Sequence, residues 1–152
     1  MSEFRHGAYW CNPGWMPFKY CYCPDAKNWA RLMKFLGAGH EPYPDDTPGR
    51  MTTMRNQETD EIVLIVSFGD LTSVSPVDIM GLVAHECMHM WQEVKRYIGE
   101  KAPGDEMEAY ALQAMCCEIL MAMLRHNPGL FHLRYDVNLR TETETETPAQ
   151  AA

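Results

Sequence analysis

Apolar residues recur along this chain in two different periods, which predict three helices and one β-hairpin. Helical spacing of apolar residues marks the segments 25–36, 76–98 and 106–126. The segments 50–56 and 61–68 carry Thr and β-branched residues on either side of a short polar turn, as the two strands of a hairpin do. The order of these elements predicts a single α+β domain, with an N-terminal helix, a small sheet and two later helices.

Residues with special backbone preferences mark the ends of the predicted helices. Ser75 is suited to the N-cap of the second helix, with Pro76 at its first position and Asp78 near the positive end of the helix dipole. Gly37 and Gly99 follow the last apolar positions of the first two helices, where a glycine commonly ends a helix. The second strand is apolar at nearly every position, which predicts cover on both faces.

The two ends of the chain have no clear periodicity. Residues 1–24 are rich in aromatic residues, Pro and Gly, and predict an irregular segment that packs on the body of the domain. Residues 141–152 are acidic and of low complexity, and predict a disordered tail. The domain is therefore expected to span residues 1–140.

The second helix carries a pattern with a specific chemical meaning. His85 and His89 are four residues apart, so both imidazoles project from one face of the helix and can bind one Zn²⁺ ion. Glu86 lies beside the first histidine, where the His-Glu-x-x-His arrangement has its general base. The alternative is that the two histidines are exposed and bind no metal. A shared ion, however, explains why such polar groups interrupt an otherwise apolar helix.

A catalytic zinc ion normally has three protein ligands, and Glu108 is the expected third. It lies in the first turn of the next helix, on the same face as Ala111, Met115 and Ile119, which should pack against the zinc helix. An equally simple role for Glu108 is capping its own helix, with Asp105 as N-cap. Glu106 is a rival ligand on a different face of the helix.

These motifs resemble those of the gluzincin branch of zinc metallopeptidases. HECMHMWQ followed by EAYALQ resembles the pared-down minigluzincin core, and small phage- and prophage-encoded proteins described as metallopeptidases. The resemblance covers about residues 50–126. The metzincin extension with a third histidine is absent, because MWQEVK follows His89.

The resemblance implies a zincin-like fold and hydrolysis of peptide bonds by a zinc-activated water. His85, His89 and Glu108 would bind the zinc and Glu86 would act as general base. It also implies that the strand at 61–68 lies beside the cleft, where an extended peptide or protein substrate pairs with it. The donor that stabilises the oxyanion is not assigned; Tyr97 and Tyr110 are both close in sequence.

The composition of the chain limits which binding partners and which cellular compartment we expect. The formal net charge is −8, which argues against a nucleic-acid partner. The N-terminus has no signal-peptide pattern and no uninterrupted apolar stretch is long enough to span a membrane, so we expect a cytoplasmic protein without a membrane partner. In that compartment the six cysteines are expected as thiols. Cys11, Cys21 and Cys23 leave open a second metal site, although their spacing is not that of a zinc finger.

Two other functions remain open at the level of sequence. A phage-type structural or regulatory protein would keep the same zinc as a structural pin without catalysis. A metal-free binding module would require both histidines to be accidental. The oligomeric state and the substrate are not indicated.

Overall fold

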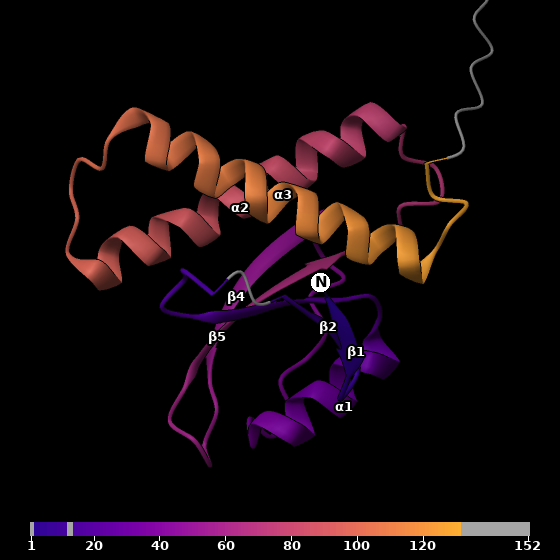
Figure 1. The fold of residues 1–152 in the computed structure, drawn as a ribbon. Helices are drawn as coiled ribbons and strands as arrows, with labels where there is room; N and C mark the ends of the chain where they lie inside the picture. The colour runs from indigo at the N-terminus through magenta and orange to yellow at the C-terminus, as the bar shows by residue number, and fades with distance from the viewer. Residues whose placement is uncertain (1, 12–13, 132–152) are drawn as a thin grey trace, which may run out of the picture.

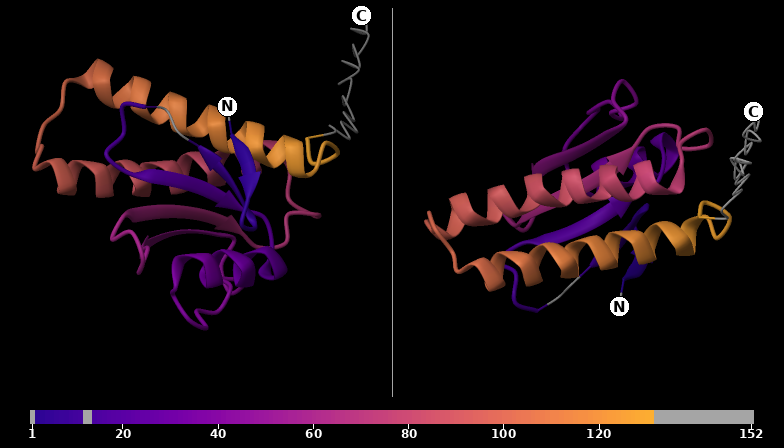
Figure 2. Two further views of the ribbon diagram at one scale, coloured as in Figure 1. Left: turned by 60° about the horizontal axis from the view of Figure 1, so that its bottom comes forward. Right: turned by 90° about the horizontal axis from the view of Figure 1, so that it is seen from above.

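The computed structural model describes residues 2–11 and 14–131, which form one five-stranded sheet and three helices. Helix α1 covers one face of the sheet, and α2 and α3 lie side by side on the other face (Figures 1 and 2). The α+β prediction is therefore confirmed at the level of a mixed sheet and three helices. The elements in chain order are β1 (Glu3–Arg5), β2 (Ala8–Cys11), β3 (Lys19–Cys23), α1 (Ala26–Leu36), β4 (Gly49–Arg55), β5 (Ile62–Phe68), α2 (Pro76–Ile98) and α3 (Asp105–His126).

The strands lie in the order β1-β2-β3-β5-β4, and only β3 and β5 run parallel. The predicted hairpin is present as the antiparallel pair β4–β5. Strand β5 has a neighbour on both sides, and all of its residues after Ile62 are buried. The expectation that a substrate pairs with segment 61–68 is therefore wrong, because both edges of that strand already bond to other strands. The sheet edge on this side is β4.

The prediction of an irregular segment at residues 1–24 is also wrong. Three strands form there, with β2 pairing to both β1 and β3. Helices cover both faces of the sheet, so Tyr20 to Cys23 are all buried and show no alternation between polar and apolar residues. The predicted tail at 141–152 lies outside the described residues.

The predicted helix ends agree closely with the structure for α1 and α2. Asp25 caps α1 by accepting a hydrogen bond from the backbone N–H of Asn28, and Gly37 ends the helix in the left-handed conformation. Ser75 caps α2 in the same way from Asp78, and Gly99 ends it. Helix α3 begins one residue earlier than predicted, because Gly104 rather than Asp105 is its N-cap.

Two hydrophobic cores hold the layers together. The larger core lies between the sheet and helices α2 and α3, and has Trp91, Met115 and Phe68 among its members. The smaller core lies between the sheet and α1, around Trp29 and Leu32. Burial of this much apolar surface is the main stabilising contribution to such a domain.

Helix α3 is long and apolar enough to cross a membrane by length and composition alone, and within residues 2–11 and 14–131 it is the one helix of this kind. Its buried residues, among them Ala111, Met115 and Ile119, face α2 and the sheet, which accounts for part of this apolar character as core packing. Met107, Tyr110 and Met121 are exposed on its outer side.

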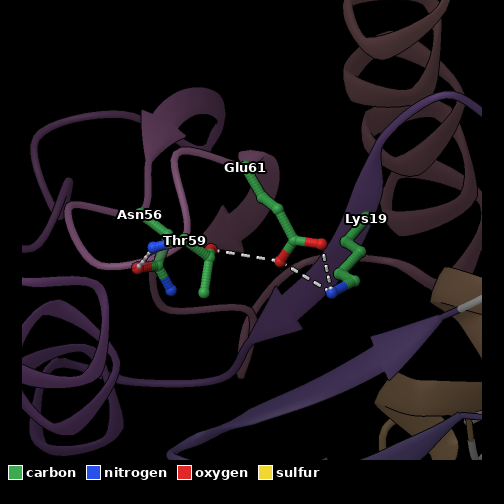
Figure 3. Close-up of polar contacts among 4 residues, drawn as sticks. All are labelled: Lys19, Asn56, Thr59 and Glu61. Carbon is green, nitrogen blue, oxygen red and sulfur yellow. Dashed lines mark hydrogen bonds and ion pairs between the residues drawn. The ribbon is translucent and has the colours of Figure 1, made fainter.

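The turn between β4 and β5 is tied to β3 by a chain of polar contacts (Figure 3). The side-chain oxygen of Asn56 accepts hydrogen bonds from the backbone N–H groups of Glu58 and Thr59. The Thr59 hydroxyl donates to the Glu61 carboxylate, which also accepts two hydrogen bonds of 2.7 Å from Lys19. These contacts support the predicted turn, although exposed pairs of this kind stabilise a fold only modestly.

Candidate metal centre

The two histidines of α2 lie together on its exposed side. The Nε2 atoms of His85 and His89 are 3.1 Å apart, and their rings are nearly perpendicular with centroids 4.7 Å apart. Two nitrogens that bind one zinc ion at about 2.0–2.1 Å each, at a tetrahedral angle, are themselves about 3.3 Å apart. The pair therefore has a separation suited to a shared zinc ion.

Gln92 orients the second histidine of this pair. The Nδ1 atom of His89 lies 3.2 Å from Gln92 Oε1, and an amide oxygen accepts hydrogen bonds but does not donate them. With the amide in this orientation the ring proton is on Nδ1, which leaves the lone pair of Nε2 directed toward His85. An outer hydrogen bond of this type is usual for histidines that bind metals. The sequence signal is a polar residue one helical turn after His89, which the sequence analysis did not use.

Glu86 lies on a different side of α2, against the sheet. Its side chain is only 4% exposed, and its carboxylate makes no hydrogen bond or ion pair with another described residue. A Cβ atom at Gly49, the first residue of β4, would lie 3.1 Å from Glu86 Oε1 and 3.0 Å from the Phe68 ring. The glycine therefore leaves the space that the carboxylate occupies, beside the edge strand.

Among the described residues, Thr52 Oγ1 is the one fully enclosed side-chain polar atom without a partner, so the Glu86 oxygens are open to a group from solvent. A water molecule held at the histidine pair is the kind of group that would satisfy them. The two histidines and Glu86 thus fit a zinc site as far as their chemistry and the Nε2 separation go.

The structure does not bring Glu108 to the histidines. Glu108 Oε1 accepts hydrogen bonds from the indole of Trp91 at 2.7 Å and from Lys95 at 2.9 Å. The side chains of Trp91 and His89 project from α2 in directions roughly 200° apart around the helix axis, because each residue turns the helix by about 100°. The hydrogen bonds from Lys95 and then from Trp91 lower the pKa of the Glu108 carboxyl. Its carboxylate is therefore already matched by two donors on another side of the helix.

Within residues 2–11 and 14–131, no group of three or more His, Cys, Asp or Glu side chains is close enough to hold a metal ion. The third ligand thus remains a prediction, and Glu108 would have to leave Trp91 and Lys95 to become one. Of the tyrosines considered as oxyanion donors, Tyr97 packs on Phe18 and Tyr110 lines an open groove with Trp15.

The N-terminal cysteines do not gather at one point. Cys11 belongs to the core beneath α2 and α3, whereas Cys21 and Cys23 belong to the core beneath α1. Burial is the main cause that raises the pKa of all three thiols, in the case of Cys23 to about 12. Buried protonated thiols on opposite faces of a sheet are structural, so the arrangement argues against a second metal site at these residues.

A different cysteine pair links α2 to α3. Interaction with the Cys87 thiol is the main cause that lowers the pKa of Cys116 below its ordinary value. Cys87 lies between the two histidines in sequence, but it is fully buried on the side of α2 that faces the core. The sequence predicts both residues only as thiols, because nothing in the spacing of positions 87 and 116 indicates contact.

Comparisons with protein families, with curated proteins and with solved structures found no match to this chain.

Proposed function

We propose that this chain is a zinc-dependent peptidase in which His85 and His89 bind the metal. The observation that carries the proposal is the 3.1 Å separation of the two Nε2 atoms, with the largely buried Glu86 side chain following His85 in the helix and making no hydrogen bond within the described chain. When bound, zinc would polarise a water molecule and the substrate carbonyl. Glu108 is the proposed third ligand, by a rotation of its side chain away from Trp91 and Lys95.

Glu86 is the proposed general base. Its carboxylate takes the proton of the attacking water and returns that proton to the amide nitrogen that leaves. Its position between α2 and Gly49 keeps it beside the start of the edge strand. An extended peptide that pairs with the outer edge of β4 would run past this carboxylate, so β4 replaces β5 as the proposed substrate strand.

The experiment compares wild-type protein with Glu86→Gln on a peptide library, with the zinc content of both measured. Glutamine has nearly the same volume, so the buried packing is expected to remain. The variant should keep one zinc ion per chain and lose cleavage by about 10²- to 10⁴-fold. Full cleavage by the variant would exclude Glu86 as the base, and wild-type protein without zinc would overturn the proposal.

A second function rests on the same pair of histidines. Both rings are exposed, and within the described part of the chain no third ligand stands beside them. This arrangement favours a zinc ion whose remaining ligands come from elsewhere, as in a non-catalytic structural or regulatory protein. Stoichiometric zinc with no cleavage of any peptide, in wild type and Glu86→Gln alike, would favour this reading.

A further inference from the structure

A crevice of about 340 Å³ opens at the carboxyl ends of the parallel strands β3 and β5. After β3 the chain enters α1 on one face of the sheet, and after β5 it enters α2 on the opposite face (Figure 1). Where successive connections leave a parallel pair toward opposite faces, the strand ends stay uncovered, and ligands bind there in many α/β proteins. The volume is within the range of small-molecule pockets.

Acidic groups surround this crevice from three connections of the chain. Asp25 follows β3, Asp45 precedes β4 and Asp70 follows β5, and the described lining residues include no Lys or Arg. Burial raises the pKa of Asp25, but the hydrogen bonds from Asn28 outweigh it and lower the pKa overall. Hydrogen bonds from Thr72 lower the pKa of Asp70. His126 is the one basic side chain among these lining residues.

One tyrosine at the crevice has a largely buried ring and a hydroxyl without a hydrogen-bond partner in the described part of the chain. Tyr22 lines the crevice and is 5% exposed, and its hydroxyl makes no hydrogen bond with another residue of the described chain. Among the described residues, Thr52 Oγ1 is the one fully enclosed side-chain polar atom without a partner, so the Tyr22 hydroxyl is open to solvent and to a group that enters the crevice. Tyr43 differs, because its hydroxyl donates to the backbone carbonyl of Phe68.

The remaining lining is aromatic and apolar. Tyr22, Tyr43 and Phe68 contribute rings, and Leu71 and Leu130 contribute aliphatic groups. Aromatic faces attract cations, and aliphatic side chains pack against the carbon stem that bears one. None of these residues belongs to the histidine pair, to Glu86 or to Glu108.

We propose that this crevice is a binding site for an ammonium or guanidinium group carried on a short apolar stem. The carboxylates of Asp25, Asp45 and Asp70 supply the opposite charge, the Tyr22 hydroxyl accepts a hydrogen bond from the cation, and the rings contact the stem. The same chemistry occurs in free alkylamines and in the Lys or Arg side chains of peptides.

The test is an NMR titration of the full-length protein in the presence of a zinc chelator. Cadaverine and agmatine are the cationic probes, and 1-pentanol is the neutral control with a similar stem. The amines are expected to shift the amide signals of Tyr22, Gly69 and Asp70 at millimolar concentration, whereas pentanol is not. A peptide with one lysine and blocked ends forms the second arm; tighter binding of the peptide assigns the cation to a peptide side chain, and weaker binding assigns it to a free amine.

Variants decide whether the carboxylates are responsible. Asp45→Asn combined with Asp70→Asn should weaken cadaverine about three- to thirtyfold, since each exposed charge contributes modestly. Tyr22→Phe should weaken it about two- to tenfold. Asp46→Asn is the matched control, because Asp46 is adjacent but does not line the crevice, and its affinity should be unchanged.

Three results would overturn the proposal: no shift with either amine, equal shifts with pentanol, or unchanged affinity in the double variant with its thermal unfolding intact. Because the titration contains no zinc and measures binding alone, its failure leaves the proposed peptidase function untouched. Failure of the zinc experiments likewise leaves this site untouched.

Discussion

The two sides of helix α2 differ in how far their polar groups are hydrogen-bonded to other protein groups. On the side toward α3, the carboxylate of Glu108 accepts hydrogen bonds from both Trp91 and Lys95, and the Cys87 thiol lowers the pKa of Cys116. On the outward side, the Nε2 atoms of His85 and His89 lie 3.1 Å from each other, and within the described residues neither has a hydrogen bond to a third group. Matched polar groups serve packing between the helices, whereas unmatched ones are free to bind something from outside. The difference separates the structural face of α2 from its candidate functional face.

The largest expected effect comes from breaking the structural face. Trp91 is fully buried, so Trp91→Ala removes its packing and one donor to Glu108, and should lower the free energy of unfolding by about 3–5 kcal/mol. Urea denaturation followed by circular dichroism measures this. His89→Ala on the exposed side is the matched control and should change stability by about 0.5 kcal/mol or less without metal. Comparable losses in the two variants would remove the contrast.

The next effect appears when zinc is added to the functional face. Free zinc at about 100 times its dissociation constant should stabilise the wild type by roughly 2.7 kcal/mol. His85→Ala should abolish this gain, because one histidine is a much weaker site than two. Thermal unfolding with and without zinc measures the gain, and His40→Ala, in a loop away from α2, serves as control. A full zinc effect in His85→Ala would place the metal elsewhere.

A smaller effect concerns the pH dependence of the structural face. The hydrogen bonds from Lys95 and Trp91 lower the pKa of Glu108 in the folded chain. Its contribution is therefore present above the ordinary pKa of a glutamate and is lost as the pH falls through the lowered folded value. Acid unfolding should cost the wild type more stability than Glu108→Gln over this range. Parallel curves for the two proteins would show that these hydrogen bonds do not favour the ionised form.

The smallest effect is a difference in thiol reactivity. Because Cys87 lowers its pKa, Cys116 should react with iodoacetamide at neutral pH, whereas Cys11, Cys21 and Cys23 stay protected by burial and raised pKa values. Cys87→Ala removes the thiol that lowers this pKa and should slow the reaction of Cys116 by roughly tenfold. Site-specific mass spectrometry follows the reaction. An unchanged rate in Cys87→Ala would rule out the Cys87 thiol as the cause.

The sequence predicted those elements whose ends are determined by a few adjacent residues. Ser75, Pro76 and Gly99 mark α2 because capping depends on a few adjacent residues. Strands β2 and β3 were missed because helices on both faces of the sheet bury successive residues, which removes the alternation that identifies a strand, and β1 was missed because its three residues are all exposed.

In the candidate site, too, features set within one helix were predictable from the sequence, and features set by packing between helices were not. The convergence of His85 and His89 follows from helical spacing alone, and the structure has it. The face of α3 that meets α2 was also predicted, with Ala111, Met115 and Ile119 buried. The side of α2 that Glu108 contacts depends on how α2 and α3 pack against each other. The periodicity within one helix does not determine this packing. Its contact with Trp91 is a property of the assembled layers.

Gly49 makes the distance between the edge strand and α2 adjustable. Only a hydrogen atom stands where a Cβ would contact Glu86 Oε1 and the Phe68 ring. Gly49→Ala would therefore insert a spacer the size of one methyl group and displace the carboxylate without altering its charge. For protein engineering, substitution of Gly49 would change the position of the Glu86 carboxylate. It would do so without any change to His85, His89 or the sequence of α2.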